Sequence, residues 1–320
     1  MRILSGIQPS GRLHLGNYFG MMKPAIEFQD QGEAFLFIAN YHAMTTVTDP
    51  TELRQNTMEV AIDFLACGLD PSRTAFFRQS DVPEVTELTW LLSVVTPMGL
   101  LERCHSYKDK TARGILPTHG LFSYPVLMSA DILAYQSNVV PVGRDQKQHV
   151  EVTRDIAMKF NNQYGPIFTI PEPSIVENVA VVPGVDGRKM SKSYNNHIEL
   201  FGNEKETRQR VMGIVTSSTP LDKPMDPATC NVFALYRLFV SNKESDEMAD
   251  RYRAGGYGYA KAKHALFDVM WNYFEPFRKK RDELIKSPDQ VETILQESAS
   301  RARGEARRTL DAARRACGLD

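Results

Sequence analysis

The segment that decides the fold of this chain reads Pro9-Ser10-Gly11-Arg12-Leu13-His14-Leu15-Gly16-Asn17. It follows a short apolar run at the N-terminus, so we interpret it as the turn between a buried strand and a helix. Such a turn presents backbone N–H groups and the positive end of a helix dipole to an anion. His14 beside it can donate a hydrogen bond to a phosphoryl oxygen. The alternative is an ordinary turn with a surface histidine, and this motif alone favours neither.

Two common nucleotide-binding fingerprints do not occur in the sequence. Gly11 and Gly16 have the spacing of a P-loop, but Asn17-Tyr18 stands where that motif requires Lys followed by Ser or Thr. A G-x-G-x-x-G dinucleotide motif is also missing. What remains is a loop with two glycines that leads into a helix N-terminus, and the choice between an anion site and an ordinary turn stays open.

Outward from this turn, continuous apolar runs alternate with stretches of helical periodicity. We expect strands at residues 2–6, 34–39, 74–78 and 138–142, and helices at about 17–32, 50–68, 85–95 and from 145 onward. This alternation predicts an α/β fold with a Rossmann-type, doubly wound parallel sheet. Such sheets bind ligands at the carboxyl ends of their strands.

Beyond residue 200 the expected strands fade and helical segments follow one another. They cover residues 204–215, 231–240, 244–253, 257–277 and 288–316. We therefore expect a sheet domain over residues 1–195 and a second, mainly helical domain over 196–287. The C-terminal helix of about 288–320 is long enough to return and pack near the first domain.

Bulk composition places the chain among ordinary globular proteins. Its 320 residues suit about two domains of ~150 residues each. The net charge of −1 means that any nucleic-acid surface must come from local clustering of basic residues. No apolar run approaches the ~18 residues of a membrane span, and the N-terminus lacks a secretory signal. The four cysteines form no C-x-x-C pair, which favours reduced thiols and a cytoplasmic location.

A second motif, Lys189-Met190-Ser191-Lys192-Ser193, lies in a polar stretch between Gly187 and Asn195. Its two lysines are three residues apart on a loop, so both ammonium groups could reach one polyphosphate. Phosphoryl chemistry needs cations where negative charge builds up on the departing pyrophosphate. The alternative is a solvated basic loop, although a methionine between two lysines is unusual there.

The two motifs together, in this order, resemble the signature motifs of class I aminoacyl-tRNA synthetases. Three further segments narrow the resemblance to bacterial tryptophanyl-tRNA synthetases, and it then extends over essentially the whole chain. They are Ser5 to Gly11, Tyr124-Pro125-Val126-Leu127-Met128 with Asp131-Ile132-Leu133, and Val140-Pro141-Val142-Gly143 with Asp145-Gln146-Lys147-Gln148-His149. The resemblance implies a Rossmann-type catalytic domain, a helical domain that recognises the tRNA anticodon, and a homodimer.

The resemblance also assigns site residues by matching motif. ATP would be bound by Gln8, Pro9, Ser10, Gly16, Asn17, Gly143, Arg144, Asp145, Val181, Val182, Lys189, Met190, Ser191, Lys192 and Ser193. Tryptophan would be bound by Leu4, His42, Tyr124, Met128, Asp131, Val140, Val142 and Gln146. Catalysis would depend on His14, Asn17, Lys110, Lys189 and Lys192. In this assignment Asp131 accepts the indole N–H, Tyr124 and Gln146 hold the α-amino group, and His42 lies on a loop at the edge of the pocket.

Each assigned residue also has an ordinary structural interpretation, such as a core methionine or a carboxylate on a helix face. Asp131 is the exception, because Leu127, Met128, Ile132 and Leu133 surround it in sequence and an acid in apolar surroundings requires a reason. A carboxylate is the natural acceptor for a lone N–H donor such as that of indole.

The sequence departs from the family pattern at two positions and lacks one cofactor motif. Arg144 stands where many members have Glu, and Leu4 stands where an aromatic residue is common. Some relatives hold an iron–sulphur cluster with four cysteines, but no C-x-x-C follows Cys230 here, so we expect no cluster. The expected cofactors are ATP and the Mg²⁺ that its phosphates carry, and we expect no protein-bound metal.

The resemblance implies a ligase that activates L-tryptophan with ATP and then transfers it to the terminal adenosine of tRNA(Trp). The alternatives are a tyrosyl-tRNA synthetase, or a non-catalytic paralogue that binds tryptophan. A pocket for tyrosine would require two polar side chains directed at the phenol hydroxyl group, rather than an apolar slot with one acid.

For the tRNA, the densest basic candidates lie in the last helix, at Arg301, Arg303, Arg307, Arg308, Arg314 and Arg315. Glu305 and Asp311 interrupt them, so an ion-paired, solvated helix is the competing interpretation.

Overall fold

The computed structural model describes residues 1–104, 118–143, 147–175 and 182–319. These residues form two compact units. The first unit comprises residues 1–11, 25–177 and 287–320, and the second comprises residues 12–24 and 178–286. The segment that contains His14 thus belongs to the same unit as the segment that contains Lys189.

The first unit is built on a five-stranded parallel sheet with the strand order β3-β2-β1-β4-β5. The strands are β1 (Arg2–Ile7), β2 (Glu33–Ile38), β3 (Thr74–Arg78), β4 (Val139–Val142) and β5 (Glu172–Ile175). The order reverses between β1 and β4, which opens a crevice at their carboxyl ends where ligands of this fold bind. The predicted Rossmann-type parallel sheet is confirmed.

The sequence patterns miss β5, one of the two edge strands. Its residues Glu172-Pro173-Ser174-Ile175 form no apolar run, and a proline argues against a central strand. The strand pairs with β4 alone, so it lies at the edge of the sheet, where a residue without a backbone N–H is tolerated.

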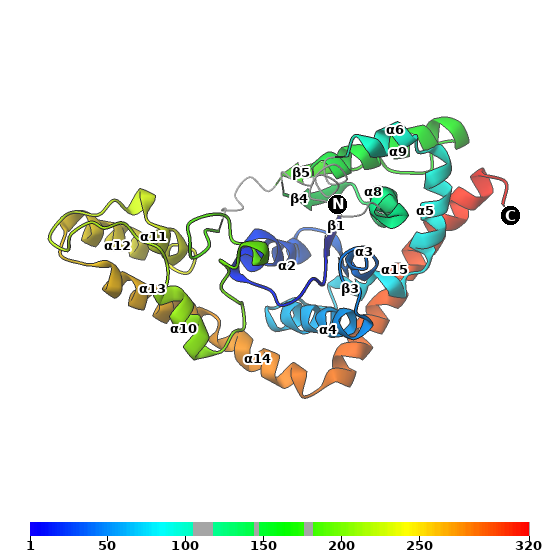
Figure 1. Cartoon of the computed structure of the whole chain (residues 1–320). Coiled ribbons are helices and arrows are strands. Elements are labelled where there is room, and N and C mark those ends of the chain that lie inside the picture. The colour runs from blue at the N-terminus through cyan, green and yellow to red at the C-terminus, as the bar shows by residue number, and fades with distance from the viewer. Residues whose placement is uncertain (105–117, 144–146, 176–181, 320) are drawn as a thin grey trace. The chain divides into compact units, whose positions relative to one another are not determined.

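Helices cover both faces of the sheet (Figure 1). On one face, Phe35 of β2 stacks on Tyr135 with ring centroids 4.8 Å apart, in a core that includes residues of α5, α8, α9 and α15. On the other face, Phe76 of β3 contacts Phe64 of α4. The helices of this unit are α2 (Lys23–Glu27, shared at the boundary), α3 (Asn40–Ala43), α4 (Pro50–Ala66), α5 (Glu84–Val95), α6 (Met98–Glu102), α8 (His119–Ala134), α9 (Lys147–Tyr164) and α15 (Pro288–Ala316).

The last helix, α15, contacts β3, α5 and α8 and so belongs to the sheet unit (Figure 1). Its apolar residues repeat at helical spacing, and Val291, Leu295, Ala302 and Leu310 are buried. No helix in the described ranges is both long enough and apolar enough to cross a membrane.

The second unit is mainly helical, with α1 (Leu15–Asn17), α10 (Glu204–Met212), α11 (Asn231–Tyr236), α12 (Asn242–Ala254), α13 (Tyr259–Tyr273) and α14 (Glu275–Ile285). The single helix expected over 257–277 is two helices, because Pro276 in the first turn of α14 has no N–H to continue the preceding helix. An aromatic cluster ties the N-terminal segment to this unit: the Tyr18 hydroxyl lies 2.9 Å from that of Tyr273, and its ring contacts Phe274.

Gly6 marks a close approach within the sheet. It pairs with Phe37 of β2, and a Cβ at this position would lie 2.6 Å from the Phe37 ring. That ring is buried and stacks on Phe77, so it cannot move aside without disturbing the core.

We therefore predict that Gly6→Ala lowers the free energy of unfolding by about 1–3 kcal/mol through overpacking. Urea unfolding followed by circular dichroism measures it. The matched control is Gly304→Ala in α15, where a Cβ meets nothing within 4 Å. Because Ala favours a helix interior over Gly, we expect this control to be stabilised by about 0.5–1 kcal/mol. Equal effects of the two substitutions would contradict the packing argument.

Candidate active site

The first motif is a short helix start that fixes the tautomer of His14. The ring Nδ1 of His14 accepts a hydrogen bond from the backbone N–H of Asn17 at 3.3 Å. In return, the Asn17 side-chain oxygen accepts from the His14 backbone N–H at 3.1 Å, which completes a capping box. Because Nδ1 is the acceptor, the proton of the neutral ring lies on Nε2. The histidine therefore has one N–H to donate.

The charge state of His14 is set by its surroundings. Burial, together with the nearby Lys192 and His197, lowers its pKa from 6.5 to about 4. At neutral pH the ring is thus uncharged and acts as a hydrogen-bond donor rather than as a cation.

The second motif packs directly against the first. Met190 is 3% exposed, and its sulphur accepts a hydrogen bond from the backbone N–H of Gly16 at 3.4 Å. A Cβ on Gly16 would lie 3.0 Å from the His14 ring and 3.3 Å from the Met190 Cβ. The methionine between the two lysines is therefore a buried anchor, which a purely solvated loop would not have.

Backbone pairing joins the two motifs as well. The N–H of Leu15 donates to the carbonyl of Ile198 at 3.0 Å, and the N–H of Leu200 donates to that of Leu13 at 2.9 Å. Within the unit, these bonds place residues 13–15 beside residues 198–200. Lys192 begins a 3-10 turn that Ser191 caps through the N–H of Ser193, at 3.2 Å. Burial lowers the pKa of Lys192, whereas Lys189 is exposed.

The acidic residue expected in the amino-acid pocket is buried in the sheet unit. Asp131 of α8 is 2% exposed. One of its oxygens lies 2.8 Å from Nε2 of His42, and the side-chain N–H₂ group of Gln79 donates to both oxygens at 2.9 Å. Burial raises the pKa of Asp131, while His42 and Gln79 oppose that rise. The carboxylate is thus an oriented acceptor inside an apolar core.

Several other residues predicted for this pocket lie in the same unit. Leu4 and Val140 are buried in one core cluster, and Met128 packs against it. The Tyr124 hydroxyl lies 2.9 Å from Nε2 of His149, and the Tyr124 ring meets His42 edge-on with centroids 6.1 Å apart. His42 lies in the one-turn helix α3, so the prediction that it lies on a loop is wrong.

Gln79 is the residue that the sequence analysis missed. It is 1% exposed, and besides holding Asp131 it accepts a hydrogen bond from the backbone N–H of Tyr41 at 3.0 Å. It links α3 to α8 immediately after β3. Its position at the carboxyl end of a predicted strand was the signal that could have found it, because that edge is where ligands bind.

The structure describes some of the remaining residues that were predicted for the ATP and tryptophan sites, and others lie outside its described ranges. Gln8, Pro9 and Ser10 follow β1, Gly143 follows β4, and Val182 is buried just ahead of the second motif. Lys110, Arg144, Asp145, Gln146 and Val181 lie outside the described residues, as does the side chain of Val142.

Residues 1–275 match the family model described as tRNA synthetases class I (W and Y). The chain belongs to this family. Its resemblance to class I aminoacyl-tRNA synthetases, and with it the predicted enzyme class, is confirmed.

The relatives are similar over their full length. The tryptophan–tRNA ligase of Rhodopirellula baltica is 54% identical over 319 residues, which cover 100% of both chains. That of Fusobacterium nucleatum is 53% identical and covers 99% of this chain and 98% of its own. A crystal structure of tryptophanyl-tRNA synthetase from Campylobacter jejuni, complexed with ADP and tryptophan, matches with a TM-score of 0.95 at 50% identity, each chain being covered entirely.

The pKa of His14 offers a test of the contact between the two motifs. We predict that its ring titrates near pH 4, measured by NMR on labelled histidine. The folded-state pKa lies below the ordinary value of 6.5, so the unfolded chain binds this proton first. His14 therefore contributes stability above pH 6.5 that is lost as the pH falls towards 4.

Removing the Lys192 charge by Lys192→Gln should raise the pKa of His14. Lys189→Gln is the matched control, because the charge of Lys189 is not among the causes of the shift. Equal shifts in the two variants, or none in either, would mean that Lys192 does not lie beside His14 in solution.

Proposed function

We propose that this family member is a tryptophan–tRNA ligase: it activates L-tryptophan with ATP to tryptophanyl-adenylate and pyrophosphate, then transfers tryptophan to the 3′-terminal adenosine of tRNA(Trp). The observation that carries the choice of amino acid is the buried, oriented carboxylate of Asp131. The names of the full-length relatives support it, and so does the tryptophan in the Campylobacter jejuni complex.

In the proposed pocket, the indole ring lies against Leu4, Met128 and Val140, and its N–H donates to Asp131. Indole has one donor and no acceptor, so an acceptor-only carboxylate is its matching partner. Gln79 and His42 donate to the same carboxylate and hold it in place. Tyr124, together with Gln146 and Val142, completes the assignment for the amino acid.

The proposed reaction is an in-line displacement at the α-phosphorus. A carboxylate oxygen of tryptophan bonds to that phosphorus while the bond to the pyrophosphate oxygen breaks. Neutral His14 donates its Nε2–H to a phosphoryl oxygen, and Lys189 and Lys192, with Lys110, stabilise the charge on the leaving pyrophosphate. Gln8 to Ser10, Gly16, Asn17 and Gly143 to Asp145 position the nucleotide, as do Val181, Val182 and residues 190–193. Mg²⁺ enters on the ATP phosphates and supplies further charge neutralisation.

Two alternatives are weaker. A tyrosyl-tRNA synthetase would share the fold, but the relatives at 53–54% identity are both tryptophan–tRNA ligases. A non-catalytic paralogue has no need of either motif, whereas this chain keeps both and packs Met190 of one against Gly16 of the other.

We further propose that residues 1–195 form the catalytic domain and residues 196–287 the domain that recognises the tRNA anticodon. The arginines of α15 are weak candidates for RNA contact. Arg303 pairs with Glu84 at 2.9 Å, Arg307 pairs with Asp311 at 3.0 Å, and Arg314 pairs with Glu87. Arg301 donates to backbone carbonyls at residues 71, 72 and 74. These contacts favour the ion-paired interpretation of α15, so we assign tRNA binding to the helical domain.

The function is tested by ATP–pyrophosphate exchange with each of the twenty amino acids. We expect tryptophan alone to support fast exchange, and Asp131→Ala to lower kcat/KM for tryptophan about 10- to 100-fold, because the indole N–H loses its acceptor. The matched control is Glu84→Ala, which removes another buried carboxylate, one that pairs with Arg303 rather than with His42 and Gln79. It should change stability without changing the KM for tryptophan. Unchanged kcat/KM in Asp131→Ala would show that the pocket assignment is wrong.

The proposed homodimer has a candidate surface on the sheet unit. Trp90 and Val94 of α5 and Met98 of α6 are 69%, 62% and 63% exposed, and the first two lie one helical turn apart. An exposed apolar stripe of this kind is typical of an interface between subunits. We propose that a second copy of the chain covers it, in the cytoplasm.

Replacing Trp90 and Val94 together by Glu should raise the dimer dissociation constant at least about tenfold, since both charges would be buried at the interface. Sedimentation equilibrium measures it. The control is the pair Val215→Glu and Leu221→Glu, which changes equally exposed apolar residues of the other unit and should leave the mass unchanged. A variant that remains dimeric would place the interface elsewhere.

A further inference from the structure

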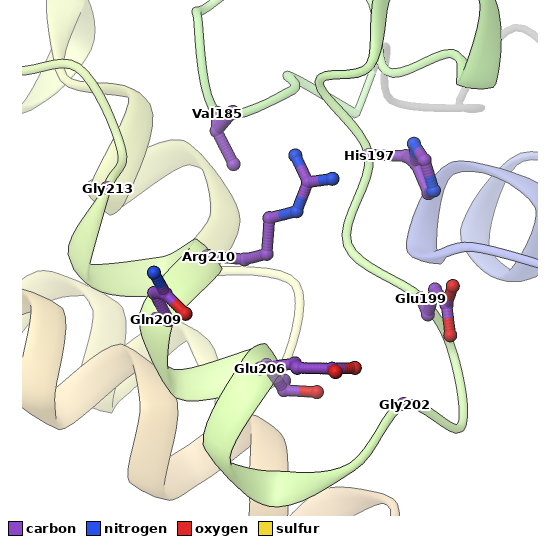
Figure 2. A pocket seen from close by; sticks show the side chains of 9 residues that line it. Val185, His197, Glu199, Gly202, Glu206, Gln209, Arg210 and Gly213 are labelled. Atoms are coloured by element: carbon purple, nitrogen blue, oxygen red, sulfur yellow. The ribbon is translucent and has the colours of Figure 1, made fainter.

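The second unit contains a pocket that is lined by Val185, by residues 197–202 after the second motif, and by α10 (Figure 2). Its volume is about 510 Å³. In Figure 2 the side chain of Arg210 extends from α10 into this space, between Val185 and His197. No role was assigned to Arg210 from the sequence.

The guanidinium of Arg210 makes two directed hydrogen bonds to one residue. Nη1 donates to the backbone carbonyl of Asn195, and Nη2 donates to its side-chain oxygen, both at 2.8 Å. Within the described part of the chain, Arg210 has no carboxylate at ion-pair distance. Its guanidinium thus binds the backbone and the side chain of one uncharged asparagine at the same time. A lysine, which has a single amino group, cannot reproduce this bidentate contact.

Asn195 is held in a conformation that few side chains adopt. Its φ of +50° lies in the left-handed region, and its N–H donates to the carbonyl of Lys192 at 2.9 Å to end the 3-10 turn Lys192–Tyr194. The left-handed residue sets the direction in which the chain leaves this turn. By fixing both ends of Asn195, Arg210 fixes the turn that carries Lys192.

The neighbouring residue, Asn196, supports the motif through three further hydrogen bonds. Asn196 is 1% exposed and accepts from the N–H of Ser191 at 2.8 Å. It donates to Asp186 at 2.7 Å and to the carbonyl of Lys189 at 3.1 Å. Asn196 therefore anchors Lys189 and Ser191 inside the unit, and Arg210 adds an anchor at Asn195, the residue that ends the turn.

We propose that Arg210 is a positioning residue for adenylate formation: through Asn195 it holds the turn that begins at Lys192 in the form that stabilises the departing pyrophosphate. This proposal rests on the proposed function. Arg210 does not touch the reacting atoms in this scheme. Its effect falls on the chemical step, because tryptophan is bound in the other unit.

The test uses the full chain and ATP–pyrophosphate exchange with tryptophan. Arg210→Met keeps the aliphatic stem and removes the donors. We expect it to lower kcat about tenfold or more, with the KM for tryptophan unchanged within about twofold. The matched control is Arg208→Met on the same helix, whose guanidinium lies 3.9 Å from the centre of the Phe267 ring and pairs with Glu204. The control should retain wild-type kcat.

Two further measurements separate positioning from a general loss of structure. First, Asn195→Gly allows the left-handed conformation without help, so Arg210→Met should cost less in that background than in the wild-type chain. Second, displacement of Lys192 should raise the pKa of His14 in Arg210→Met and leave it unchanged in Arg208→Met. If Arg210→Met does not fold, Arg210→Lys replaces it, with the same split between kcat and KM expected.

A kcat equal to that of the wild type in Arg210→Met overturns the proposal, as does a parallel loss of kcat and tryptophan affinity. Additive effects of the Arg210 and Asn195 substitutions also overturn it. Failure of the proposed function is distinguishable, because the wild-type chain would then show no exchange with tryptophan.

Discussion

The backbone pairing between residues 13–15 and residues 198–200 is the constraint on which the chemistry of the second unit depends. These two segments lie far apart in the sequence, yet two N–H···O bonds of 3.0 and 2.9 Å align them. The pairing allows Met190 to reach Gly16 and brings the charge of Lys192 close enough to lower the pKa of His14. Neither motif would have these properties alone. The glycine at residue 16 suits this close packing, since a Cβ there would press on both His14 and Met190.

In the proposed amino-acid pocket the electrostatics are reversed. There a carboxylate is buried, and burial raises its pKa. Three hydrogen bonds from His42 and Gln79 offset part of the desolvation cost, because donors directed at the charged form favour it. His42 comes from α3, which follows β2, and Gln79 begins the 3-10 turn that follows β3. The edge of the sheet thus supplies the donors that favour the charged form of an acid inside a core.

The sequence predicts most of the fold because buried parallel strands are continuous apolar runs, as at residues 34–39 and 74–78. It does not predict β5, because Glu172-Pro173-Ser174-Ile175 is not an apolar run. Pro173 is tolerated there because the strand lies at an edge of the sheet. It also joins α13 and α14, since helical periodicity continues through Phe274 and only Pro276 marks the break. For the site, Asp131 is conspicuous as an acid among apolar residues. Gln79 is not, because a glutamine after a strand has no pattern of its own until the partner carboxylate is located in space.

Charge placement on α15 shows why local sequence is a poor guide to nucleic-acid surfaces. Six arginines between residues 301 and 315 are typical of a basic patch when counted along the chain. In three dimensions, the partners of Arg303 and Arg314 come from α5, more than two hundred residues earlier. An arginine engaged by a carboxylate contributes little net positive potential, and releasing it for a phosphate would break an existing contact. By contrast, Arg210 is held by an asparagine, which leaves its full charge in the unit that carries the second motif. Positive potential for a polyphosphate or an RNA backbone is therefore available where an arginine has an uncharged hydrogen-bond partner. The number of arginines along the chain is a poorer guide.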